Sequence, residues 1–392
     1  MKRFLLYLIT GLLICKGYSQ VGVDSIIRQV DRNNKAIASS NKFQQAKAAE
    51  YKTGLTPYDP FVEYDYMYGS PAGAGNQRDF SVSQRFDFPT SYKRKRELSG
   101  NQVIQTNLQQ QVFRQDVLLE AKQAALHLIY LNKKIEELRR RLRSTEGLVK
   151  DIQQKLDKGD ITILDMNKAK LQLLTIKSDL ELSENEKSVR LARLIELNGG
   201  EDISINDTSY PIMTTVPPFD ELDSLIEAND PIIKMYEQDK LIQTNQLYVQ
   251  KAMNLPKLEA GYHSQGILGQ SYRGFHVGLS VPLWENKNRV NAAKANIDYA
   301  TSAAEAHRIE HRQDNRQAYE QLGIRTKIMA EHAALLSSLN NTYLLNKSLS
   351  LGQITVVQYF YEVSFYFTAY DKYLQTELEY HQALARLYKF QL

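Results

Sequence analysis

Two histidines lie four residues apart, at the spacing that could bind a metal ion. His307 and His311 would share one face of a helix, as metal-binding histidine pairs do. The catalytic zinc motif also needs a glutamate directly after the first histidine, and here the residues between the pair are Arg-Ile-Glu. A packed or solvated pair fits this pattern better than a metal site. No metal centre is therefore predicted.

A second chemical signal is the basic run Lys93–Arg96, which is echoed by Lys287 and Arg289. Such residues suit contacts with phosphate groups. Nucleic-acid binding is not predicted, because no aromatic platform accompanies the run and the net charge is only +4. No glycine-rich phosphate loop and no nucleophile–base set occurs. We therefore expect no enzyme and no cofactor.

The N-terminus has the pattern of a secretory signal peptide. Lys2 and Arg3 precede the apolar run 4–14, and small residues stand at Gly17 and Ser19. The run is too short for a spanning helix, so residues 1–19 are predicted to be removed. Cys15 is the only cysteine of the sequence. An exported chain without disulfides is expected, which is either soluble or crosses a membrane as strands.

The chain is duplicated. The stretch Leu156–Asp165 recurs 193 positions later as Leu349–Gln358. The same offset holds as far as the sequence Leu-Ala-Arg-Leu, which occurs at 191–194 and again at 384–387. Each copy places a lone glycine, Gly159 or Gly352, between long helical patterns. The predicted repeats are 20–200 and 219–392, joined by the linker 201–218.

Within each repeat, a helical segment precedes a strand hairpin and a long helical hairpin. The helical segments are 24–54 and 219–253, and the β-hairpins are 61–88 and 257–283, with alternating apolar and polar residues. A proline-free helix from about 92 to 158 has a 3.5-residue apolar period, which is typical of coiled coils. A matching helix is expected from about 288 to the Gly352 turn.

The aromatic face of the hairpins favours a lipid-facing position, and the polar face then lines a lumen. Four strands cannot close a barrel in lipid, so closure needs several protomers. Two protomers give eight strands with a filled interior, and three give twelve strands with room for a polar duct. A trimer is the smaller answer if the polar set lines water. That set is Glu63, Asp65, Asp79, Arg85, Glu259, His263 and His276.

The ordered set of features resembles the TolC-type outer-membrane efflux family over nearly the whole mature chain. Three features carry the resemblance: the duplicated order of elements, the Asn33-Asn34 and Asn229-Asp230-Pro231 helix starts leading to Pro60 and Pro256, and the tip motif Gly-x-Ile-Thr-x-x-Asp/Gln. It implies a mainly α fold with a periplasmic α-barrel and a twelve-stranded, homotrimeric transmembrane β-barrel. It also implies a passive exit duct in the outer-membrane lipid, with a periplasmic adaptor (membrane fusion) protein and an inner-membrane pump of the RND type as partners.

Carried over by position, the resemblance assigns two groups of site residues. The adaptor-docking tips fall on Lys158, Gly159, Asp160, Ile161 and Thr162, and on Leu351, Gly352, Gln353, Ile354 and Thr355. The candidates for a pore constriction are Asp165, Gln358, Tyr361 and Glu362. The family often has acidic residues at this constriction. Here Gln358 replaces the second acid, so the constriction is formed either by acidic side chains or by aromatic ones.

The second return helix looks most like the heavy-metal branch of the family, the CusC/CzcC-like channels. Metal cations or small toxic compounds are the cargo that this implies. A soluble periplasmic coiled-coil scaffold or adaptor is the alternative function. Two matched lipid-facing hairpins favour the channel, because a scaffold has no use for them.

Overall fold

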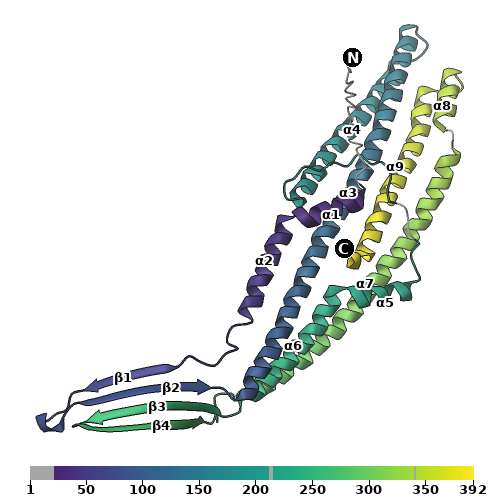
Figure 1. Cartoon of the computed structure of the whole chain (residues 1–392). Coiled ribbons are helices and arrows are strands. Elements are labelled where there is room, and N and C mark those ends of the chain that lie inside the picture. The colour runs from purple at the N-terminus through teal and green to yellow at the C-terminus, as the bar shows by residue number, and fades with distance from the viewer. Residues whose placement is uncertain (1–21, 212–214, 340) are drawn as a thin grey trace, which may run out of the picture. The chain divides into compact units, whose positions relative to one another are not determined.

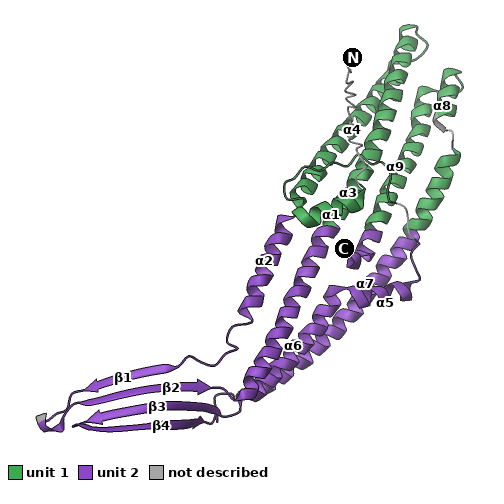
Figure 2. Cartoon of the chain, viewed as in Figure 1, with its two compact units in different colours: residues 1–33, 120–214, 325–382 green, residues 34–119, 215–324, 383–392 purple. Residues whose placement is uncertain are grey.

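A computed structural model describes residues 22–211, 215–339 and 341–392. The predicted signal peptide lies outside these residues. Contacts divide the chain into two units, shown in Figure 2: unit 1 takes residues up to 33, 120–214 and 325–382, and unit 2 takes 34–119, 215–324 and 383–392. Each unit draws segments from both halves of the sequence, so neither unit is one repeat. The division into repeats and a linker stays a prediction.

Unit 2 contains one antiparallel sheet in the order β1-β2-β3-β4, seen in Figure 1. Its strands are β1 (Phe61–Met67), β2 (Gln77–Phe86), β3 (Lys257–Ile267) and β4 (Gln270–Ser280). A short 3₁₀ turn, η1 (Ala72–Ala74), lies between β1 and β2. β3 and β4 are joined by Leu268 and Gly269, both at positive φ, as a two-residue hairpin turn requires. Pairing of β2 with β3 unites the two predicted hairpins in one sheet.

Two helices of unit 2 begin at side-chain caps. The Asn34 side chain accepts from Ile37 N at 2.8 Å at the start of α2 (Lys35–Glu50). Asp230 caps α6 (Pro231–Met253) in the same way, accepting from Ile232 N at 2.8 Å. α5 (Phe219–Asn229) precedes it, and η2 (Lys389–Gln391) ends the chain's helical part. The sequence predicted single helices over 24–54 and 219–253. Both are broken here, because an Asx cap starts a new helix and Pro231 cannot continue an old one.

Three long helices contribute to both units: α3 (Pro89–Asp157), α7 (Arg289–Ser338) and α9 (Val356–Leu387). α1 (Val23–Asn33), α4 (Ile163–Leu197) and α8 (Asn341–Ser350) belong to unit 1. The predicted apolar period of α3 is confirmed by its buried positions. Leu128, Leu131, Ile135, Leu138 and Ile152 are all at most 5% exposed.

The predicted continuous helix from 288 to 352 is wrong, because α7 and α8 are separate. α7 ends at Ser338, and Leu339 after it is not helical. Ser337 and Ser338 each donate their hydroxyl to a backbone carbonyl three residues back, at 2.9 and 2.7 Å. Such side chains compete with the helix hydrogen bonds, which explains an interruption at this place. Among the described residues, no helix is both long enough and apolar enough to cross a membrane.

Candidate functional site

The strand register places all seven predicted lumen residues on one face of the sheet. Residues directly opposite each other in antiparallel strands share a face, and so do alternate residues along a strand. Asp65 pairs with Asp79, and Arg85 pairs with Glu259. Glu63 pairs with Ser81, which pairs on its other side with His263. Ser83 pairs with Gly261, which pairs on its other side with His276. The sequence pattern was therefore enough to sort the two faces, while the lumen role stays a prediction.

Charged groups on this polar face bind one another. Arg85 Nε lies 2.9 Å from Glu259 Oε2, and His276 Nε2 lies 3.7 Å from Glu259 Oε1. A Cβ added to Gly261 would lie 2.3 Å from the His276 ring and 2.6 Å from Val82 O, so only glycine leaves room for that imidazole. An open hollow of about 850 Å³ lies beside the end of the sheet that carries Arg85 and Glu259, and these two residues form part of its lining. The face can hold polar or charged solutes.

The opposite face of the sheet is apolar and open. The register puts Val62, Tyr64, Phe80, Phe275, Val277 and Leu279 on it. Phe275 is 89% exposed and Val277 is 83% exposed. Exposed apolar surface of this extent marks a site that another apolar phase or partner covers.

The two predicted tips have the same backbone geometry. Gly159 and Gly352 adopt φ of 80° and 70°, the left-handed region that favours glycine. The amide after each glycine closes the helix end: Asp160 N donates to Lys155 O, and Gln353 N donates to Ser348 O, both at 2.9 Å. Each glycine is therefore required by a helix C-cap.

The rest of the tip motif is a capping box. The Thr162 hydroxyl accepts from Asp165 N at 3.2 Å, and Asp165 Oδ2 accepts from Thr162 N at 3.0 Å. Thr355 and Gln358 repeat both bonds, at 3.1 and 2.9 Å. Asp165 and Gln358, two of the constriction candidates, thus have a structural task at the starts of α4 and α9. Aspartate in one copy of the tip motif and glutamine in the other both supply the oxygen that this capping bond needs.

A shared apolar core brings the two tips together within unit 1. Ile152 and Met166 of the first hairpin belong to one cluster with Leu349, Val356 and Tyr359 of the second. Ile161 and Ile354, from the two tip motifs, pack against this cluster. The polar tip residues remain exposed, and Leu351 is 62% exposed. Docking of a partner at these tips stays a prediction.

The remaining constriction candidates lie on the open side of α9. Tyr361 is 61% exposed and packs edge-on against Phe365, with ring centroids 4.9 Å apart. Glu362 beside it is also exposed. Tyr359 and Phe360 are buried at 4% and belong to the core instead. An exposed aromatic and an exposed acid are therefore both available next to the tip.

A buried ionic cluster between α3 and α9 was missed from the sequence. Arg141 is 5% exposed and holds Asp371 with two bonds of 2.8 and 3.0 Å. Its Nε donates to Glu137 at 2.9 Å, and its guanidinium lies 4.1 Å from the Phe367 ring centroid. Burial lowers the pKa of Arg141, but the bonds to Asp371 and Glu137 outweigh it and raise that pKa above its usual value. The four-residue spacing of Glu137 and Arg141 indicates a pair on one helix face, but it indicates neither their burial nor the third member, Asp371.

His307 and His311 form a packed pair, as predicted. His311 Nε2 lies 3.2 Å from Asp230 Oδ2, and its Nδ1 lies 3.1 Å from Asn315 Nδ2. His307 stacks on Tyr236, with ring centroids 4.2 Å apart. Within the described ranges, no group of three or more His, Asp or Glu side chains is arranged to hold a metal ion.

The order of elements, two helical hairpins and one four-stranded sheet, matches the fold of solved outer-membrane channels, which confirms the predicted mainly α fold with four strands per chain. Several solved structures share it. A membrane protein from Pseudomonas aeruginosa matches with TM-score 0.80 and 16% identity, over 94% of this chain and 93% of that one. The outer-membrane channel OprN matches with TM-score 0.77 and 16% identity, over 94% and 89%. CusC, whose structure concerns transmembrane channel formation, matches with TM-score 0.71 and 15% identity, over 96% and 95%.

At these identities the likeness shows the fold alone. No protein-family model matches the chain, and no curated protein matches it in sequence. The similarity to CusC is no greater than that to OprN, so the heavy-metal branch stays a prediction.

Proposed function

We propose that this protein is an outer-membrane channel that serves as the passive exit duct of a tripartite efflux system. The observation that carries the proposal is the apolar face that the sheet exposes. It is supported by the fold, which the chain shares with solved channels over 94–96% of its length. In a membrane that face contacts lipid, and the charged face lines the lumen. The solved channels with this fold are named as channels, not as enzymes.

Three copies of the chain assemble in this proposal. Four strands leave two open edges, at β1 and β4, whose backbone groups need partners in lipid. Three copies supply twelve strands, a number that leaves an aqueous interior when the inner side chains are polar. Outer-membrane lipid surrounds the sheet and the helices extend into the periplasm.

The tips bind a periplasmic adaptor protein, and an inner-membrane pump of the RND type supplies the energy. Support comes from the matched geometry of the tips, which present exposed Lys158, Asp160 and Gln353 beside exposed Leu351. Metal cations or small toxic compounds are the proposed cargo. The exposed Tyr361 and Glu362 next to the second tip are the proposed constriction.

The test is where the full chain fractionates and at what mass it runs in mild detergent. An outer-membrane protein with about three times the monomer mass, converted to monomer by heating, is the expected result. A monomer in the soluble periplasmic fraction would overturn the proposal and support the scaffold alternative.

A further inference from the structure

We propose that the junction between the sheet and the helices of unit 2 binds the phosphate groups of anionic phospholipid heads. This inference rests on the proposed function. The junction surface consists of five exposed cations and one tryptophan: Lys93, Arg96, Lys251, Lys287, Arg289 and Trp284.

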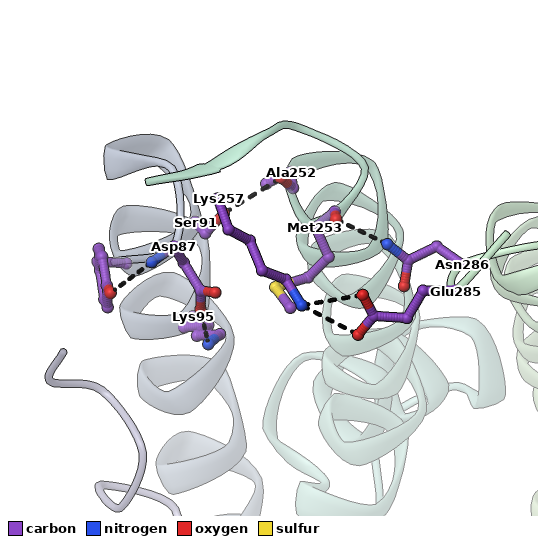
Figure 3. A network of polar contacts seen from close by, with 9 residues as sticks. Asp87, Ser91, Lys95, Ala252, Met253, Lys257, Glu285 and Asn286 are labelled. Atoms are coloured by element: carbon purple, nitrogen blue, oxygen red, sulfur yellow. Dashed lines mark hydrogen bonds and ion pairs between the residues drawn. The ribbon is translucent and has the colours of Figure 1, made fainter. Parts of the chain in front are cut away.

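Three segments of the chain are held at one level by the hydrogen bonds drawn in Figure 3. Ser91 Oγ, in the first turn of α3, donates to Ala252 O at the end of α6, at 3.2 Å. Asn286 Nδ2, between β4 and α7, donates to Met253 O at 2.7 Å. Ser91 and Asn286 are 0% and 7% exposed, so these bonds are shielded from water. These bonds therefore join the three segments that carry the cations.

The carboxylates of the junction are already used by other cations. Asp87 binds Lys95 at 2.7 Å, and Glu285 binds Lys257 at 3.0 Å, as Figure 3 shows. Glu97 binds Arg94 at 2.8 Å. The stretches 87–97, 251–257 and 284–289 hold eight Lys and Arg against these three acids, so five cations remain. That surplus exceeds the +4 of the entire chain, so the positive charge is concentrated here.

The five surplus cations are Lys93, Arg96, Lys251, Lys287 and Arg289. In the part of the chain that the structure describes, none of them forms an ion pair, and all five are exposed. Charge complementarity therefore points to an anionic partner.

The apolar band of the sheet ends at the same level. Val281 and Leu283 continue the alternation of β4 beyond Leu279 and are 56% and 67% exposed. Trp284 follows at 80% exposure and is the only tryptophan of the chain. Tryptophan next to a row of lysine and arginine, at the edge of an apolar band, is the arrangement found at the headgroup level of membranes. A phospholipid head supplies both the phosphate and the interfacial layer that Trp284 needs.

The experiment uses Trp284 as its own probe. The full chain is inserted into vesicles of phosphatidylcholine alone or with added phosphatidylglycerol, at low and high salt. Trp284 fluorescence and its quenching by brominated lipid report on the junction. We expect the anionic lipid to favour binding by about tenfold or more at low salt, because each surface cation adds to the attraction, and salt to reduce the effect.

Charge variants test the cause. The fourfold variant Lys93→Gln, Arg96→Gln, Lys287→Gln and Arg289→Gln should lose the preference for anionic lipid but still enter neutral vesicles. Exchanging Lys and Arg at the same four positions should retain it and guards against a folding defect. The matched control, with the same change in charge in unit 1, is Lys150→Gln, Lys168→Gln, Lys170→Gln and Lys347→Gln.

Each remaining outcome decides between the two proposals. If the unaltered chain inserts but ignores the anionic lipid, or if the unit 1 control loses the preference as fully as the junction variant, the phosphate surface is refuted while the channel stands. If the unaltered chain enters neither kind of vesicle, the proposed membrane channel itself fails.

Discussion

Arg141 shows how one residue can determine the stability of a coiled coil. Removing its side chain leaves Glu137, which is 6% exposed, with only Arg140 as its partner. Asp371 is about half exposed and recovers water, so the cost lies at the low end for a buried ion pair. We expect Arg141→Ala to lower the free energy of unfolding by about 3 kcal/mol, measured by urea denaturation.

Arg139→Ala is the matched control, two residues away on the same helix. Arg139 binds Glu184 at 2.7 Å, but both side chains are about half exposed. Exposed pairs contribute about 0–1 kcal/mol. An Arg141→Ala loss no larger than that of Arg139→Ala would contradict the role of the buried cluster.

His381 gives unit 1 a dependence on pH. Burial, with the charge of Lys133 nearby, lowers the pKa of His381 to about 4. The folded state therefore binds this proton less readily than the unfolded state, whose histidine titrates near 6.5. Stability is complete above pH 6.5 and is lost as the pH falls toward 4, by about 2 kcal/mol at pH 5.

The replacement His381→Phe keeps a ring against Tyr210, whose centroid lies 4.2 Å away, and removes the titration. Urea unfolding at pH 7.5 and pH 5 should then show a smaller loss for the variant than for the original chain. An equal loss in both proteins would mean that other groups cause the acid sensitivity.

At the scale of elements, substitutions in the first tip can show whether Asp165 acts as a helix cap. Thr162→Ala should cost about 1 kcal/mol, because the first turn of α4 loses an acceptor, and faster hydrogen exchange at residues 163–166 would report it. Asp165→Ala should act similarly. Asp165→Asn keeps an oxygen for Thr162 N and should cost much less.

The same series separates capping from a pore constriction. If Asp165 only caps, then Asp165→Asn leaves ion conductance through the assembled channel unchanged. Altered conductance with normal hydrogen exchange would instead assign the carboxylate to the pore. Thr355→Ala removes the matching cap of the second tip and is the control for Thr162→Ala.

Elements set by local periodicity could be predicted from the sequence, and those set by a single polar contact could not. Alternation sorted every lumen candidate onto one face, and the apolar period placed the α3 seam. The break at Asn34 and the end of α7 at Ser338 depend on side chains that compete with the backbone, which a periodic pattern does not reveal. The contact of Arg141 with Asp371 was missed because the two residues lie 230 positions apart in the sequence.

At the scale of the whole molecule, the exposed apolar face of the sheet is what distinguishes a channel from a scaffold. Val277 lies near the middle of β4 on this face, opposite Ala260, and is 83% exposed, so a substitution of its side chain disturbs little packing among the described residues. In a channel, Val277→Arg places a charge in lipid and should cost about 2–4 kcal/mol per copy. The yield of heat-sensitive trimer should fall accordingly.

The control is His276→Arg, which puts the same charge on the adjacent residue of the same strand but on the polar face. It should leave assembly largely intact, because a lumen-facing charge stays in water. If the protein is instead a scaffold in water, Val277→Arg should be harmless, because an exposed arginine is well solvated there. Equal assembly of the two variants would therefore argue against lipid contact at this face.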